Sequence, residues 1–278
     1  MCSVFIDLEK AYDRVPRQEV WRCMREKGVP EKYVRLVQDM YTDVKTLVRS
    51  SVGDTEKFTV KVGLHQGSAL SPYLFDLVMD VIAKDVKEAP PWSMMFADDI
   101  ALCGYTREEV ERKTEAWRKA LEERGLKVSR KKTEYIAYND TNSGDITMQD
   151  YILKKVNNFK YLGSTLSQDG ELDQEIEKRI QAGWRNWKRL SGVLCDRKLS
   201  ARRKGKIYKV AVRPAMTYGA ETWSIKKSQE KKLDVAEMKM LRWACGHTRL
   251  DRIENQVIRE RVKVTEIHRK VQEKRLRW

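Results

Sequence analysis

Two adjacent aspartates, Asp98 and Asp99, interrupt an apolar run at residues 92–103. Apolar residues on both sides predict two strands with the carboxylates at the connecting turn. Neighbouring carboxylates in such surroundings repel each other and lose hydration, which a bound cation offsets. Mg²⁺ suits this place because it accepts carboxylate oxygens while keeping water and phosphate in its shell. Taken alone, however, the pair is better explained as a polar turn in solvent.

A third carboxylate, Asp7, ends the apolar stretch of residues 2–8, which is typical of a buried strand. If that strand lies beside the hairpin, the three carboxylates converge and can hold two divalent ions. Such a pair of ions stabilises the attacking 3′ oxygen and the leaving pyrophosphate of an in-line displacement. A lone Asp7 would more often cap a strand end. Its combination with Asp98 and Asp99 is what predicts a two-metal site.

Residues 63–72 form a candidate ligand loop between these carboxylates. Gly63 and Gly67 permit close approach of backbone to a ligand, and Gln66 offers a donor and an acceptor beside them. The segment lacks the lysine of a phosphate-binding P-loop. A plain loop before a helix explains it equally well when it is taken alone.

The elements expected around these residues form an α+β sheet with helices on one face. Helices are predicted after Pro16, after Pro30, from Ser71 with its hydroxyl as cap and Pro72 in the first turn, and from a capping box at Thr106 to residue 125. Strands are predicted at residues 2–8, 46–52, 57–62, 133–138 and 158–166, with a tight turn at residues 53–54.

Composition narrows the class of protein further. The five cysteines are scattered without paired spacing, which indicates a reducing, intracellular compartment and no disulfide framework. The longest apolar stretch is interrupted by proline and aspartates, so we expect no membrane span and no signal peptide. The low glycine and proline content is typical of a globular chain.

The excess positive charge lies entirely in the last part of the chain. Residues 171–278 hold 29 Lys and Arg against 14 Asp and Glu, which equals the net charge of +15 of the whole protein. Such a block predicts binding to phosphate backbones. The alternative, a solvated helical surface, explains alternating charge well but a one-signed excess poorly. From residue 171 onward the predicted structure is mostly helical, so we expect a boundary near residue 170. Five tryptophans lie in this part, most of them expected in the core, with one or two free to stack on nucleic acid: Trp184, Trp187, Trp223, Trp243 and Trp278.

In this order, the segments resemble the reverse transcriptases of LINE-type (non-LTR) retrotransposons, and the resemblance covers essentially the whole chain. Five ordered motifs at compatible spacing are highly specific, whereas no single one would be. They are similar to the family's motifs A to E at residues 5–15, 63–72, 96–99, 125–134 and 159–163, and the segments at 218–223 and 240–243 resemble the sequence that follows the palm.

The resemblance implies roles for individual residues. Asp7 and Asp98 would bind two ions of Mg²⁺ or Mn²⁺, with Asp99 supporting them. The other matches are Tyr12 as the steric gate under the incoming sugar, Gln66 and Gly67 as contacts to template and nucleotide, and Lys132 or its neighbour Lys131 as the proton donor to pyrophosphate. Without the motifs, Tyr12 would be a core aromatic and the lysine pair a solvated turn.

The family also implies an architecture and partners: a polymerase palm at residues 1–170 and a helical, basic thumb at 171–278, acting on an RNA template, a DNA primer and deoxynucleoside triphosphates. A fingers region and an endonuclease domain are expected beyond the present chain, which would make it a fragment truncated at the N-terminus. Three interpretations stay open: an RNA-directed DNA polymerase, a catalytically inactive transposon-derived protein that binds nucleic acid, and a metal-dependent nuclease. The nuclease leaves Tyr12 and the 63–72 loop unexplained.

Overall fold

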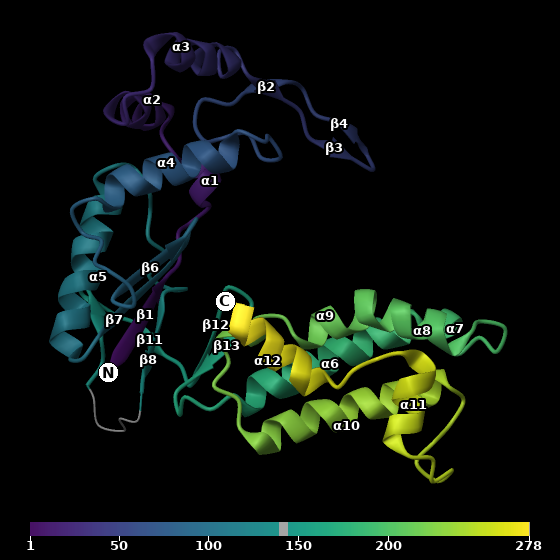
Figure 1. The fold of residues 1–278 in the computed structure, drawn as a ribbon. Helices are drawn as coiled ribbons and strands as arrows, with labels where there is room; N and C mark the ends of the chain where they lie inside the picture. The colour runs from purple at the N-terminus through teal and green to yellow at the C-terminus, as the bar shows by residue number, and fades with distance from the viewer. Residues whose placement is uncertain (139–143, 278) are drawn as a thin grey trace. The chain divides into compact units, whose positions relative to one another are not determined.

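The computed structural model describes residues 1–138 and 144–277, so that Trp278 lies outside the described residues. The chain divides into two compact units, unit 1 at Met1–Asn157 and unit 2 at Asn158–Trp278 (Figure 1). The division precedes the boundary expected near residue 170, because a hairpin that opens unit 2 packs on the first long helix of that unit. None of the described helices combines the length and the apolar composition needed to cross a bilayer.

A five-stranded sheet with the order β11-β8-β1-β7-β6 forms the centre of unit 1. Strand β1 is central, pairs antiparallel with β7 and β8, and buries all five of its residues. The pairing of β11 with β8 is parallel. The predicted first strand, the hairpin and the strand at residues 133–138 are confirmed, with these bounds: β1 Cys2–Ile6, β6 Ser93–Phe96, β7 Asp99–Gly104 and β8 Glu134–Ala137. The short edge strand β11, Lys154–Lys155, was not predicted.

The described residues of unit 1 form five helices: α1 Ala11–Arg14, α2 Arg17–Glu26, α3 Glu31–Met40, α4 Ser71–Ala83 and α5 Arg107–Glu122. Helix α5 packs on β7 and β1, and α4 packs on α2 and α5. The predicted cap of α5 is present, since Thr106 accepts a hydrogen bond from the Glu109 amide at 3.2 Å. The predicted Ser71 cap is wrong: its hydroxyl donates to the His65 carbonyl at 2.6 Å, because Ser71 already lies inside α4.

The ribbon at residues 45–59 differs from the prediction. It consists of two short exposed pairs, β2–β5 and β3–β4, and the turn lies at residues 51–52 instead of 53–54. Ser50 fixes this turn, because its hydroxyl donates to the Gly53 carbonyl and accepts from the Val52 amide. With no buried face, side-chain alternation does not set the register. The short strands of unit 1 are β2 Lys45–Thr46, β3 Arg49–Ser50, β4 Gly53–Asp54, β5 Phe58–Thr59, β9 Thr147–Met148 and β10 Tyr151–Ile152.

Unit 2 is a hairpin followed by helices. The single strand predicted at residues 158–166 is wrong: β12 and β13 form a hairpin whose turn residues, Leu162 and Gly163, both have positive φ. Such turns match the natural twist of paired strands. The elements are β12 Asn158–Tyr161, β13 Ser164–Ser167, α6 Asp173–Arg189, α7 Ser191–Leu194, α8 Ala201–Ile207, α9 Arg213–Met216, α10 Lys227–Ala244, α11 Asn255–Val262 and α12 Ile267–Arg277, with a π-helical segment at Tyr208–Val212.

A buried ionic cluster lies in the core of unit 2 around Glu237, which is fully buried. Its carboxylate accepts hydrogen bonds from the Tyr208 hydroxyl at 2.9 Å, from Arg213 at 2.8 Å and from Arg259 at 2.7 Å. The Ile267 amide adds a fourth donor at 3.0 Å. Both oxygens are therefore paired, which offsets the cost of removing the charge from water.

Candidate active site

The three predicted carboxylates lie at one end of the central sheet. Register pairs Ile6 of β1 with Ile100 of β7, so the next residue of one strand, Asp7, leaves the sheet beside the first residue of the other, Asp99. Phe96 pairs with Asp99 across the β6–β7 hairpin, which leaves Ala97 and Asp98 as a two-residue turn. Ala97 adopts a left-handed conformation with φ of 52° to make that turn.

The electrostatics of this edge disfavour ionised carboxylates. The Oδ2 atom of Asp7 is buried without a hydrogen-bond partner, although its side chain as a whole is 41% exposed. Burial raises the pKa of Asp7 above its ordinary value, and the Asp98 charge raises it further, while Lys132 lowers it. The pKa of Asp99 is also raised, by burial first and then by Asp98 and Asp7. The three side chains therefore lie within each other's field.

Their side chains do not close around a common point. Within residues 1–138 and 144–277, no three His, Cys, Asp or Glu side chains lie close enough to form a ready metal-binding group. The Lys132 ammonium instead lies 3.8 Å from Asp7 Oδ2. A carboxylate oxygen without a hydrogen bond and an all-carboxylate set of ligands nevertheless fit a hard divalent cation. The structure thus brings the residues to one place, and their role as ligands stays a prediction.

The backbone of Asp7 is held from both sides by a turn at residues 129–133. The Asp7 amide donates to the Thr133 hydroxyl at 3.3 Å, and the Asp7 carbonyl accepts from the Ser129 amide at 2.8 Å. Thr133 is fully buried, and its own amide closes the turn on Ser129. The same turn carries Lys132. Sequence reasoning missed Thr133 and Ser129 as positioning residues, because 126 residues separate Thr133 from Asp7 and no local pattern joins them.

The 63–72 loop is tied to the segment that follows Asp7. The Leu64 amide donates to the Tyr12 carbonyl at 2.8 Å, and the Gln66 side chain donates to the Asp13 carboxylate at 2.8 Å. Gly63 has a φ of +84°, and a Cβ there would lie 2.7 Å from the Asp13 carbonyl oxygen. Gly67 also has positive φ, but the space around it is open. The first glycine therefore serves packing, whereas the second leaves room for a ligand.

Tyr12 lies between the core and the carboxylate edge. Its ring stacks on Phe75 of α4, with centroids 4.5 Å apart and planes 16° apart. It is only partly buried. Burial raises the pKa of the Tyr12 hydroxyl, with further contributions from Asp76 and Asp98. The charge of Asp98 at the carboxylate edge thus reaches the Tyr12 hydroxyl.

Arg17 is a second positioning residue that sequence reasoning missed. Its guanidinium donates to the Gly63 carbonyl at 3.2 Å and to the Tyr41 carbonyl at 3.1 Å, and it lies over the Tyr41 ring. The His65 ring of the loop also stacks on Tyr41, with ring centroids 4.2 Å apart. Helices α2 and α3 therefore hold the loop in place.

A sheet that places one carboxylate beside an Asp-Asp hairpin turn, covered by helices, is the architecture of a polymerase palm. The family model "Reverse transcriptase (RNA-dependent DNA polymerase)" matches residues 1–166. The chain belongs to the reverse transcriptase family.

Relatives come from non-LTR retrotransposons, which confirms the LINE-type resemblance. The Pol polyprotein of the R2 element of Popillia japonica is 26% identical over 187 residues, covering 60% of this chain and 31% of that protein. The RNA-directed DNA polymerase of the mobile element jockey from Drosophila funebris is 24% identical over 260 residues, covering 88% of this chain and 28% of that protein. The chain therefore spans less than a third of the length of either relative.

Solved structures share the fold. Telomerase from Candida tropicalis without ligand superposes with a TM-score of 0.51 at 13% identity, over 99% of this chain and 46% of that one. Telomerase from Candida albicans, in complex with a TWJ fragment of telomeric RNA, gives 0.50 at 12% identity, over 95% of this chain and 49% of that one. The expected α+β palm-and-thumb fold is confirmed.

Proposed function

We propose that this chain is the palm-and-thumb part of an RNA-directed DNA polymerase that transfers nucleotides by a two-metal mechanism. The observation that carries the proposal is the placement of Asp7 beside Asp99 at the β6–β7 turn, with one buried oxygen of Asp7 that accepts no hydrogen bond. Carboxylates assembled at a cost to their own ionisation are typical of sites that receive a cation.

Asp7 and Asp98 would hold the ions, and Asp99 would support them. We take the ions to be Mg²⁺ or Mn²⁺, because both prefer carboxylate oxygens and accept phosphate oxygens alongside. When bound, they supply charge that stabilises the attacking 3′ oxygen and the leaving pyrophosphate. The clamp of Thr133 and Ser129 on the Asp7 backbone keeps that carboxylate at the sheet edge.

The surrounding residues position the nucleotide in this proposal. Tyr12, fixed by its stacking on Phe75, would lie under the incoming sugar as the steric gate. Gln66, held by Asp13, and the open backbone at Gly67 would contact template and nucleotide. Lys132 is 73% exposed and lies 3.8 Å from Asp7, so its ammonium is free to turn toward a triphosphate and give a proton to pyrophosphate.

We propose an RNA template and a DNA primer as partners, with deoxynucleoside triphosphates as substrates. The charge of unit 2 supports nucleic-acid binding, since residues 158–278 hold 30 Lys and Arg against 15 Asp and Glu. The telomerase that shares this fold was solved with an RNA fragment bound. Unit 2 would act as the thumb on the primer–template duplex.

Primer extension tests the proposal. The purified chain, given an RNA template, a labelled DNA primer, deoxynucleoside triphosphates and Mg²⁺ or Mn²⁺, should lengthen the primer. Asp98→Asn should abolish the extension, because the turn loses its charge. Asp85→Asn is the matched control, since Asp85 is exposed, lies just past the end of α4 and is not among the groups that shift the pKa of Asp7 or Asp99. Extension by Asp98→Asn at the wild-type rate would refute the site.

A catalytically inactive nucleic-acid-binding protein is the second candidate. One observation favours it: the Lys132 ammonium lies 3.8 Å from Asp7 Oδ2 and already offsets the negative charge that a metal ion would otherwise neutralise. Salt-dependent binding of primer–template without any extension would select this candidate. Shortening of the oligonucleotides by the same carboxylates would indicate a nuclease instead.

A further inference from the structure

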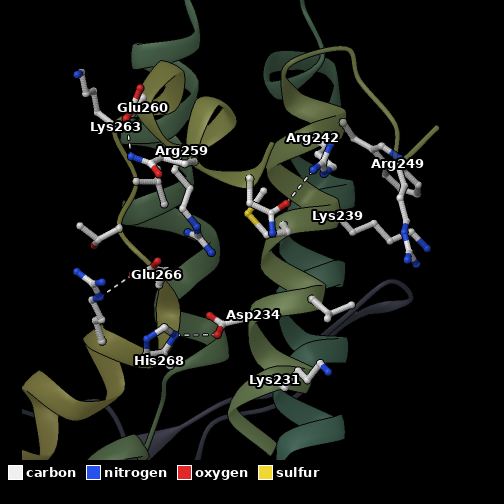
Figure 2. Close-up of a pocket in the computed structure, with 18 of the residues that line it drawn as sticks. Lys231, Asp234, Lys239, Arg242, Arg249, Arg259, Glu260, Lys263, Glu266 and His268 are labelled. Atoms are coloured by element: carbon white, nitrogen blue, oxygen red, sulfur yellow. Dashed lines mark hydrogen bonds and ion pairs between the residues drawn. The ribbon is translucent and has the colours of Figure 1, made fainter. Parts of the chain in front are cut away.

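A basic groove lies on unit 2 between α10 and residues 248–269, with a volume of about 1630 Å³. Figure 2 shows Arg259, Lys263 and His268 across the groove from the α10 residues Asp234 and Arg242. Pockets for small molecules usually measure about 300–1,000 Å³, so this groove suits a segment of a polymer better. It contains none of the residues that the proposed nucleotidyl transfer uses.

The charge of the groove is positive and largely uncompensated. Seven lysines and arginines line it against three acidic residues. Two of these acids are already engaged, Asp234 with His268 at 2.7 Å and Glu266 with Arg269 at 2.6 Å. In the described part of the chain, five of the seven cations pair with no carboxylate: Lys231, Lys239, Arg242, Arg249 and Lys263. Of these, Arg242 donates instead to the Ile253 carbonyl and the Asn255 side chain. A polyanion is the complementary partner.

Trp243 gives the groove an aromatic wall. Its side chain is 40% exposed, and its ring is held by Trp184 and Trp187 at centroid distances of 5.4 and 5.7 Å. The Lys239 ammonium lies 5.2 Å from the ring centroid. A fixed, partly exposed indole beside unpaired cations is the arrangement on which an unpaired base stacks while its phosphates meet the cations.

We propose that this groove binds a single-stranded polynucleotide, with a base on Trp243 and phosphates along Lys239, Arg249 and Lys263. Stacking requires an exposed base face, which a duplex keeps inside its helix. An acidic peptide would match the charge but would leave the indole unused. The groove is therefore a second nucleic-acid site, additional to the proposed grip on the primer–template duplex.

Binding of labelled oligonucleotides to the full chain, followed by fluorescence anisotropy, tests this site. The probes are uridine RNA and thymidine DNA of about 12 nucleotides, a length that one single-strand-binding domain covers, together with a duplex of the same length. Trp243→Ala should weaken binding of the single strands by about 5- to 150-fold, the loss expected for one stacked base. Trp243→Phe, which keeps a stacking face, should retain most of the affinity. A weaker effect on DNA than on RNA, or the reverse, identifies the natural strand.

A matched pair of triple variants tests the position of the charge. Replacement of Lys239, Arg249 and Lys263 by Gln should remove three phosphate contacts. The slope of log K against log salt concentration should therefore become shallower by about two. The control replaces Arg202, Arg203 and Lys206 of α8 by Gln, which removes the same charge outside the groove. This control should keep its affinity for single strands within about twofold, because it removes no groove contact.

Equal losses in the two triple variants would overturn the proposal, and so would wild-type affinity in Trp243→Ala. Displacement of the oligonucleotide by polyglutamate at equal charge concentration would assign the groove to an acidic protein. If Trp243→Ala does not fold, the triple variants decide alone. If the chain extends no primer but binds single strands through the groove, the proposed function is refuted and this inference stands. If the chain extends primers but the groove variants bind single strands as the wild type does, the proposed function stands and this inference is refuted.

Discussion

Glu237 in unit 2 is far more deeply buried than Asp7 in unit 1, yet Glu237 is the better satisfied of the two carboxylates. Four donors surround Glu237, from Tyr208, Arg213, Arg259 and the Ile267 amide. Asp7 is partly exposed, but one of its oxygens is buried with no hydrogen-bond partner. Burial of a charge therefore does not by itself mark a functional site. A carboxylate oxygen that accepts no hydrogen bond and lies near other carboxylates, as in Asp7, is a better indicator.

The two units also differ in net charge. Unit 1 holds 26 basic and 26 acidic residues, and unit 2 holds 30 and 15. Three of the acids in unit 1 gather at one sheet edge, whereas several cations of unit 2 line a groove without acidic partners. Under the proposed function, the carboxylates of unit 1 would hold cations and the basic surface of unit 2 would bind a polyanion.

The largest effect on stability should come from Glu237→Ala. This change leaves the buried Arg213 and the partly buried Arg259 without their partner. Breaking a buried ion pair from one side costs about 3–5 kcal/mol. Urea unfolding followed by tryptophan fluorescence measures the loss. Glu230→Ala, on the same helix and outside the ionic cluster, should change stability by less than about 0.5 kcal/mol. Comparable losses in both variants would show that the Glu237 cluster is not the structural centre of unit 2.

In unit 1, the two glycines of the 63–72 loop should respond unequally. Gly67→Ala should cost about 1–2 kcal/mol, the penalty of a left-handed residue with a side chain. Gly63→Ala should cost more, by about 1–3 kcal/mol, because its Cβ would also meet the Asp13 carbonyl. Thermal unfolding of the two variants checks the order. If Gly67→Ala is the more damaging, the loop is not anchored at Gly63.

The smallest effect should come from Asp7→Asn, and it should have the opposite sign. Because the pKa of Asp7 is raised in the fold, the fold binds this proton more tightly than the unfolded chain does. Stability is therefore lost as pH rises from the ordinary aspartate pKa through the raised one. At pH 7, Asp7→Asn should be more stable than wild type, by less than about 1 kcal/mol because solvent screens a partly exposed group. The difference should vanish near pH 3.

Divalent ions sharpen the same comparison. A tenfold excess of Mg²⁺ over its Kd should stabilise the wild type by about 1.4 kcal/mol and leave Asp7→Asn unchanged. Asp85→Asn should behave as wild type in both respects. If neither Mg²⁺ nor Mn²⁺ changes the melting temperature of the wild type, the carboxylate edge holds no cation.

Much of unit 1 could be predicted because its signals are local. The apolar runs around Asp98 and Asp99 predicted the hairpin, and the capping box at Thr106 predicted the start of α5, as the structure shows. Errors arose where no buried face fixes the register. The turn of the exposed ribbon was misplaced by two residues, since the Ser50 hydroxyl and not a glycine closes it.

The framework of the site could not be predicted, because it depends on contacts between distant residues. The Thr133 and Ser129 clamp on Asp7 joins segments more than a hundred residues apart, and Arg17 reaches Gly63 across 46 positions. The groove of unit 2 left a partial signal. Its α10 residues recur at helical spacing, from Lys231 through Val235 and Met238 to Arg242, but only the fold shows which segment faces them.

The pairing of β1 with β7 has a consequence for how this site can be lost. Asp99 lies beside Asp7 because a fixed number of residues separates the β6–β7 turn from Ile100. Deleting one residue in β7 would shift each side chain between the deletion and the turn to the opposite face of the sheet. The exposed ribbon at residues 45–59 has no such dependence. Deletion of a single codon should therefore leave the carboxylate site intact when it falls in the ribbon and disrupt the site when it falls in β7. In related copies of this gene, the positions of such deletions would show which copies have lost the site.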